Sequence, residues 1–136
     1  MDQKETIGVI GSGTMGNGIA HVSSLSGYKV FLIDVNDDFL DKGINTISSN
    51  LDKQIAKKII SNEDKSKVLN NIKCSTNMHD VENADLVIEA VPENKEIKNN
   101  IFSKLDSICH PETILASNTS SISITGIAEN TNRADK

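Results

Sequence analysis

A glycine-rich segment between an apolar run and an amphipathic stretch constrains the fold of this chain more than any other feature. The run Thr6–Ile10 leads into the sequence GSGTMG at residues 11–16, and the stretch Thr14–Ser26 then carries apolar residues at helical spacing before Gly27. This order predicts a buried strand, a G-x-G-x-x-G turn and a helix. The turn pattern is weak on its own, so its surroundings decide its meaning.

The three glycines of the turn have separate physical roles. Gly11 permits a tight turn, Gly13 lets the backbone approach a pyrophosphate, and Gly16 lets the helix pack closely on the strand. The unpaired N–H groups at the helix N-terminus and the positive end of its dipole then face the phosphates. The pattern therefore predicts a dinucleotide site at this turn.

An acidic residue follows at the expected distance. Lys29–Ile33 is β-branched and aromatic, which predicts a second strand, and Asp34 ends it, 18 residues after Gly16. A carboxylate there accepts hydrogen bonds from free ribose hydroxyls but repels a 2′-phosphate, and the only Arg of the chain is Arg133. These features favour NAD over NADP. A methyltransferase also uses a glycine turn and an acid, but its loop more usually reads G-x-G-x-G, which Met15-Gly16 does not fit.

The rest of the chain alternates strands and helices. After Asp37 or Asp38 as a cap, apolar spacing predicts a long helix to Ile59, and a fresh cap at Ser61-Asn62 starts a shorter one. We expect this pair to form a helical hairpin that stands out from the domain. Further strands are predicted at Ile72–Ser75, Asp85–Val91 and Thr113–Ala116, and further helices at Asn94–Ser107 and Ile122–Glu129.

Alternation of this kind implies parallel strands with helices on both faces. We therefore predict an α/β, Rossmann-type doubly wound, mainly parallel sheet with the hairpin inserted after the second strand, and one domain over residues 1–136. The net charge of −5 and the lack of a basic stripe exclude nucleic acid as the main partner. No segment approaches the roughly 20 apolar residues of a membrane span, and we expect a cytoplasmic protein.

Two isolated cysteines do not suggest a metal site. Cys74 and Cys109 are distant from each other and from any pair of histidines at ligand spacing. We expect each cysteine to be a buried or idle free thiol, and we expect no metal.

A polar segment follows the last predicted strand. In "TILASNTSSISI", residues 113–124, four hydroxyls and a carboxamide stand between two apolar runs. Ligands of open α/β sheets bind at the carboxyl ends of strands, near the reversal of strand order. We therefore expect this polar tip to lie against the reacting end of the cofactor.

Three segments together carry a family resemblance: "VIGSGTMGNGIA", "DLVIEAVPENKEIK" and "TILASNTSSISIT". The chain resembles the N-terminal half of a short-chain 3-hydroxyacyl-CoA dehydrogenase, including the bacterial 3-hydroxybutyryl-CoA type. The resemblance implies that Ser120 lies between nicotinamide and substrate and that Asn118 lines the same pocket, so that both position the reactants. The implied NAD contacts are Gly11, Ser12, Gly13, Thr14, Met15, Gly16, Asp34, Glu93, Lys98, Asn118 and Ser120.

The resemblance also implies an acyl-CoA substrate. Asn50 and Lys57, on the predicted hairpin, occupy places where the family contacts coenzyme A, although the family often has Ser where Asn50 stands. Two alternatives stay open for the lysines. Lys57 is equally typical of a solvated helix lysine, and Lys98 could pair with a neighbouring Glu on its helix.

The family oxidises (S)-3-hydroxyacyl-CoA to 3-oxoacyl-CoA by hydride transfer to NAD, with a His as general base. The resemblance places that His in an H-F-F-N-P type segment beyond Lys136, and we do not expect His21, His79 or His110 to replace it. It also implies a C-terminal helical domain that forms a homodimer. We therefore expect a truncated NAD-binding domain that binds NAD without oxidising 3-hydroxybutyryl-CoA.

Two other interpretations remain. A related hydroxy-acid or sugar-acid dehydrogenase of the L-gulonate type shares the glycine turn and the SNTS segment. A non-catalytic nucleotide-binding module would use the same turn without chemistry.

Overall fold

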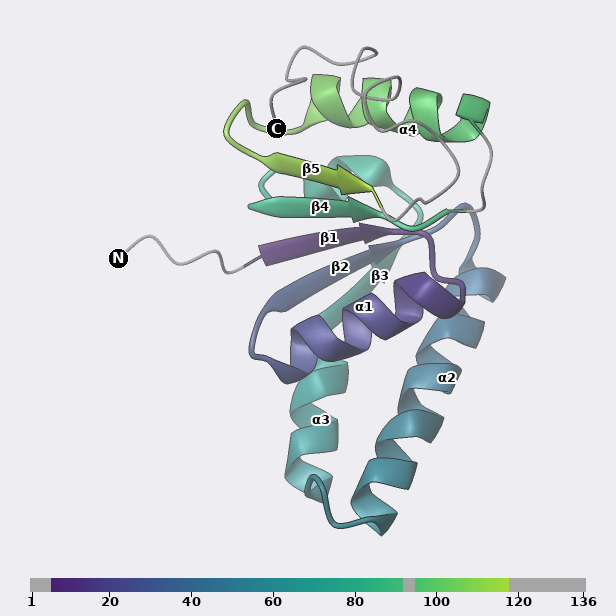
Figure 1. Cartoon of the computed structure of the whole chain (residues 1–136), viewed down its shortest axis with the longest axis vertical. Helices are drawn as coiled ribbons and strands as arrows, with labels where there is room; N and C mark the ends of the chain where they lie inside the picture. Colours follow the sequence, from purple (N-terminus) through teal and green to yellow (C-terminus); the bar gives the residue numbers. More distant parts are fainter. Residues whose placement is uncertain (1–5, 92–94, 118–136) are drawn as a thin grey trace.

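The computed structural model describes residues 6–91 and 95–117 as a sheet covered by helices on both faces (Figure 1). The sheet has the strand order β3-β2-β1-β4-β5, and every neighbouring pair is parallel. In chain order the elements are β1 (Thr6–Ile10), α1 (Thr14–Leu25), β2 (Lys29–Ile33), α2 (Asp37–Ala56), α3 (Asn62–Asn70), β3 (Ile72–Ser75), the 3₁₀ helix η1 (Met78–Val81), β4 (Leu86–Glu89), α4 (Lys95–Ile108) and β5 (Ile114–Ser117). The predicted α/β, Rossmann-type fold is confirmed.

The first strand lies at the centre of the sheet, and its register brings three loops together. Ile10 stands opposite Ile33 of β2 and opposite Glu89 of β4, so the carboxyl ends of these strands are level. The strand order reverses at β1, because the chain moves to one side through β2 and β3 and to the other through β4 and β5. Such a reversal is the point at which open α/β sheets bind ligands.

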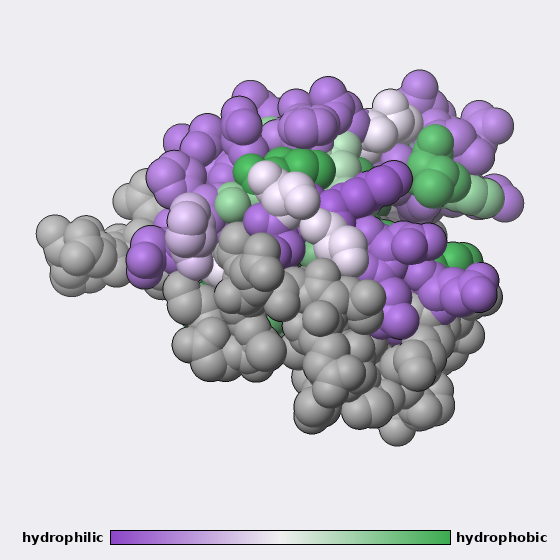
Figure 2. Space-filling view, turned by 90° about the horizontal axis from the view of Figure 1, so that it is seen from above, coloured by the Kyte–Doolittle hydropathy of each residue, from purple (hydrophilic) through white to green (hydrophobic). Residues whose placement is uncertain are grey.

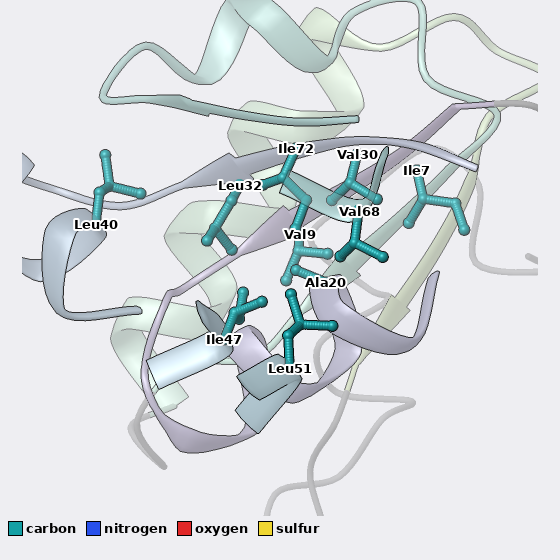
Figure 3. Packing of buried hydrophobic residues seen from close by; sticks show 10 residues of the cluster. All are labelled: Ile7, Val9, Ala20, Val30, Leu32, Leu40, Ile47, Leu51, Val68 and Ile72. Atoms are coloured by element: carbon teal, nitrogen blue, oxygen red, sulfur yellow. The ribbon is translucent and has the colours of Figure 1, made fainter. Parts of the chain in front are cut away.

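Each face of the sheet has its own hydrophobic core, since side chains alternate along a strand. Helices α1, α2 and α3 cover one face, where Val9, Leu32, Ile47 and Leu51 are fully buried (Figure 3). Helix α4 and η1 cover the other face. That second core consists of Ile10, Ile33, Val81, Ala84, Val87, Phe102, Leu105, Cys109 and Leu115.

The predicted helical hairpin is present as α2 and α3, which extend from the sheet toward the bottom of Figure 1. The cap of α2 is Asn36, whose side chain accepts a hydrogen bond from the Phe39 N–H at 2.9 Å, so the expected cap at Asp37 or Asp38 was wrong. Ser61 caps α3 as expected.

The cap of α3 is a reciprocal capping box. The Ser61 hydroxyl accepts from the Asp64 N–H, and the Asp64 carboxylate accepts from the Ser61 N–H at 3.0 Å. These hydrogen bonds favour the ionised carboxylate and lower the pKa of Asp64. The cap therefore weakens only in acid, as the pH falls through that lowered pKa and the carboxyl is protonated.

Not every apolar residue of the helical pattern turns inward. The apolar spacing of residues 14–26 predicts an inner face formed by Met15, Ile19, Ala20 and Val22. Ala20 is buried, but Met15 and Val22 are 55% and 64% exposed, so this prediction is wrong at both positions. Seen from the α4 side, the coloured surface is mostly hydrophilic, with hydrophobic residues in a few separate places (Figure 2). Within the described residues, every helix is too short or too polar to span a bilayer.

The burial pattern of the hairpin predicts opposite outcomes for two isoleucine truncations. Ile47 is fully buried between α2 and the sheet, whereas Ile59, beyond the end of α2, is 63% exposed. Ile47→Ala should lower the free energy of unfolding by about 2–5 kcal/mol, and Ile59→Ala by no more than about 0.5 kcal/mol. Urea unfolding followed by circular dichroism measures both. Equal losses would contradict the packing of α2 described above.

Candidate dinucleotide-binding site

The glycine turn is so tight that two of its positions cannot hold a side chain. Gly11 has φ +104°, and a Cβ added to it would lie 2.8 Å from the carbonyl oxygen of Ala90. A Cβ on Gly16 would lie 1.7 Å from the carbonyl oxygen of Gly11. By contrast, a Cβ on Gly13 would meet no atom within 4 Å, which leaves open space above the turn. The tight turn expected at Gly11 and the close packing expected at Gly16 are thus present in the structure, whereas the role of Gly13 toward a pyrophosphate stays a prediction.

The N-terminus of α1 differs from those of the next two helices. Its cap is Gly13, which has no side chain to bond the first N–H groups, and its first turn holds no acidic residue. Both α2 and α3 have a side-chain cap and two acids in the first turn. Unbonded N–H groups and an uncompensated dipole end attract an anion, so the start of α1 is suited to phosphate.

Asp34 holds the glycine turn from the neighbouring strand. Its Oδ2 atom accepts hydrogen bonds from the Ser12 N–H at 2.8 Å and from the Ser12 hydroxyl at 2.6 Å, and its Oδ1 atom accepts from the Val35 N–H at 2.7 Å. The Ser12 hydroxyl also lies 3.0 Å from the carbonyl oxygen of Phe39. The carboxylate therefore joins the end of β2 to the turn after β1.

A glycine of α2 completes this contact, and the sequence interpretation missed it. A Cβ on Gly43 would lie 2.9 Å from the carbonyl oxygen of Ser12. Helix α2 therefore rests its backbone on the glycine turn. The signal was present in the sequence, because a glycine inside a helical pattern often marks a close approach of two backbones.

Two adjacent pockets open at the carboxyl ends of the strands, and Gly11, Asp34, Phe39 and Val91 line both. The smaller has a volume of about 510 Å³ and is further lined by Ser12, Gly13, Thr14, Met15, Lys42 and Ala90. The larger, of about 1030 Å³, extends past Val35, Thr76, Met78 and His79 to the apolar side chains of α4. Both pockets are lined mostly by apolar surface with a few polar groups, which is typical of ligand sites, and residues 12–15 of the glycine turn border one of them while α4 borders the other.

Lys98 is completely buried, and its partner lies on a strand. Its Nζ atom donates to both carboxylate oxygens of Glu89 at 2.8 and 2.7 Å, and both side chains have an exposed fraction of 0%. The Glu partner therefore belongs to β4 and not to the helix of Lys98. Sequence reasoning missed Glu89, although a charged residue inside the apolar run DLVIEAV needs a buried partner.

The other expected site residues divide into two groups. Asn50 and Lys57 are exposed on α2 and at its C-cap, and neither lines the two pockets. Glu93, Asn118 and Ser120, together with the helix expected at Ile122–Glu129, lie outside the described residues.

Of the histidines and cysteines, only one side chain reaches the site described here. His79 lines the larger pocket, whereas His21 is buried against Gln54 of α2, with Nε2 and Oε1 3.2 Å apart. Both cysteines are free thiols. Partial burial raises the pKa of the Cys74 thiol, and the carboxylates of Asp41 and Asp37 add to the shift, so this thiol is protonated at neutral pH.

Comparison with known proteins identifies the family. The family model described as "3-hydroxyacyl-CoA dehydrogenase, NAD binding domain" matches residues 6–136. The chain belongs to this family. A 3-hydroxybutyryl-CoA dehydrogenase of Bradyrhizobium diazoefficiens is 47% identical over 96% of the chain and 44% of the relative. A second, from Clostridioides difficile, is 41% identical over 96% of the chain and 46% of the relative.

Solved structures of the 3-hydroxyacyl-CoA dehydrogenase family have the same fold. The (S)-3-hydroxybutyryl-CoA dehydrogenase of Ralstonia eutropha superposes with a TM-score of 0.95 at 44% identity, over 98% of this chain and 47% of that one. The 3-hydroxybutyryl-CoA dehydrogenase of Escherichia coli gives 0.94 at 38% identity, over 98% of this chain and 28% of that one. The chain thus spans less than half the length of these relatives. The expected family and NAD-binding domain are confirmed.

The glycines of α1 provide a matched test of the site geometry. Gly16→Ala should shift α1 away from the turn, cost about 1–3 kcal/mol of unfolding free energy and weaken NADH binding, because its Cβ meets the Gly11 carbonyl at 1.7 Å. Gly18→Ala should stabilise by about 0.5–1 kcal/mol and leave binding unchanged, because its Cβ meets nothing within 4 Å. Urea unfolding and NADH fluorescence measure the two effects. Equal behaviour of the two variants would contradict the close packing at Gly16.

Proposed function

We propose that the two pockets hold NAD, with its pyrophosphate at the start of α1 and its adenosine ribose at Asp34. The observation that carries this proposal is the uncapped N-terminus of α1 beside a carboxylate at the end of the next strand. The adenine would lie in the larger pocket, between Val35 and Met78. Gly13 gives the pyrophosphate its closest approach, because the space above it is open.

The carboxylate of Asp34 has capacity for a ribose hydroxyl. An ionised carboxylate accepts about four hydrogen bonds, and Ser12 and Val35 supply three of them. A phosphate in the same place would meet a negative charge at short range. This arrangement favours the free hydroxyls of NAD over the 2′-phosphate of NADP.

We further propose that the complete protein oxidises (S)-3-hydroxyacyl-CoA to 3-oxoacyl-CoA, with a short acyl chain such as 3-hydroxybutyryl. The names of the relatives from Bradyrhizobium and Clostridioides support this substrate class. Bound NAD supplies the hydride acceptor. In this proposal Glu93 contacts the cofactor after β4, while Asn118 and Ser120 position the nicotinamide and the substrate oxygen.

The exposed end of the hairpin is the proposed contact for coenzyme A. Asn50 and Lys57 are accessible on α2 and at its C-cap, where an ammonium group can meet a phosphate. The contact of Lys98 with the cofactor, which the family resemblance implies, stays a prediction. The same holds for a homodimer and a cytoplasmic location of the complete protein.

Cofactor choice tests the role of Asp34. NADH should bind saturably and NADPH at least about tenfold more weakly, as read from the fluorescence of the bound cofactor, because the Asp34 carboxylate repels a 2′-phosphate. Asp34→Asn should weaken the binding of NADH about tenfold and reduce the difference in affinity between NADH and NADPH. Asp38→Asn, which removes the same charge from an exposed residue outside both pockets, serves as control. Equal affinity of the parent chain for the two cofactors would contradict the proposal.

Coenzyme A binding tests the hairpin contact. Lys57→Gln should weaken binding of coenzyme A several-fold in isothermal calorimetry, because one phosphate loses its ammonium partner. The control is Lys29→Gln, at the first residue of β2. It removes an equal charge and should leave the affinity for coenzyme A unchanged. If Lys57→Gln binds coenzyme A as tightly as the parent chain does, the role of Lys57 is contradicted. A parent chain that binds NADH but no coenzyme A would instead favour a hydroxy-acid or sugar-acid substrate.

A further inference from the structure

The buried ion pair of Glu89 and Lys98 is the strongest feature that the proposed function leaves unexplained. Glu89 is the last residue of β4, and Lys98 lies in the first turn of α4. Both side chains are removed from water entirely. Burying two charges costs several kcal/mol per ion before their attraction is counted, and an apolar pair of the same size is often as stable. Stability alone is therefore a poor explanation for this pair.

The ion pair holds the backbone of the residue that follows the sheet. The Val91 N–H donates to Oε2 of Glu89 at 2.6 Å, and the Val91 carbonyl oxygen accepts from Nζ of Lys98 at 3.3 Å. The ladder between β1 and β4 has already ended at this point, with the Ala90 N–H bonded to the Ile10 carbonyl. Beyond the end of the ladder, hydrogen bonds from the two charged side chains thus hold the backbone of Val91.

Val91 is placed where its backbone affects ligand binding. It lines both pockets, whereas neither Glu89 nor Lys98 lines either of them. Its nitrogen lies close to the glycine turn, since a Cβ on Gly11 would come within 3.2 Å of it. A shift of Val91 would therefore change the wall of both pockets beside Gly11.

We propose that Glu89 and Lys98 are positioning residues that hold Val91 against the glycine turn and thereby set the affinity for the dinucleotide. This inference rests on the proposed binding of NAD in the two pockets. It adds a role through the backbone of Val91 to the direct cofactor contact that is predicted for Lys98. It also assigns a role to Glu89, whose carboxylate connects the lysine to the end of β4.

A double substitution separates positioning from stability. Glu89→Leu combined with Lys98→Met replaces the ion pair by apolar side chains of similar size, which can preserve the fold but cannot bond the Val91 N–H and carbonyl. We expect an unchanged midpoint of urea unfolding and NADH binding weakened at least about tenfold. The control is Asp52→Asn combined with Lys65→Met, which removes an ion pair whose side chains are 61% and 25% exposed. It should change neither quantity.

Amide exchange at Val91 provides a second readout if the double variant does not fold. Glu89→Gln is isosteric and removes only the charge, so the hydrogen bond to the Val91 N–H should weaken. Hydrogen exchange measured by NMR should be at least several-fold faster at Val91 than in the parent chain, relative to Ala90, and NADH affinity should fall in the same variant. Faster exchange with unchanged affinity would show that holding Val91 has no effect on binding.

The outcomes distinguish this inference from the function on which it rests. A parent chain that binds NADH, with a folded double variant that binds it equally well, overturns the positioning role alone. A parent chain that does not bind NADH overturns both the proposed cofactor site and the positioning role.

Discussion

The contact between the first turn of α1 and the end of β1 is the constraint on which the rest of the structure depends. It exists because Gly16 and Gly11 lack side chains, so that the helix can rest directly on the carbonyl of the turn. This contact fixes the direction of α1 and presents its uncapped N-terminus above the sheet. It also brings Ser12 within reach of Asp34 and allows Gly43 of α2 to pack against the Ser12 carbonyl.

Polar side chains then secure the loops at the point where the sheet ends. On one side of β1, the Asp34 carboxylate bonds the backbone of Ser12. On the other, Glu89 and Lys98 bond the backbone of Val91. Both arrangements replace ladder hydrogen bonds that the strands no longer supply, since buried backbone N–H and carbonyl groups need partners. The loops on the two sides of the central strand are thus held by hydrogen bonds for the same physical reason.

Local patterns predicted the elements well and the contacts between them less well. The strands Thr6–Ile10, Lys29–Ile33 and Ile72–Ser75 follow from apolar runs, and the structure confirms their bounds. Met15 is exposed because the close approach at Gly16 turns the start of α1 toward the pockets, which helical spacing alone does not encode. The pairing of Glu89 with Lys98 joins a strand to a helix across a loop, so no rule of spacing within one element could find it.

The position of β1 has a consequence for how the chain reaches this structure. The central strand pairs with β2, which follows it after a single helix, and with β4, which lies much further along the chain. The hydrogen bond of the Thr6 N–H to the Asp85 carboxylate joins residues that are 79 positions apart. The helical hairpin and β3 are synthesised in between. Contacts of such long range slow folding, because the entropy of closing the loop is lost before the pairing is gained. During synthesis β1 therefore keeps one edge open until β4 has been made.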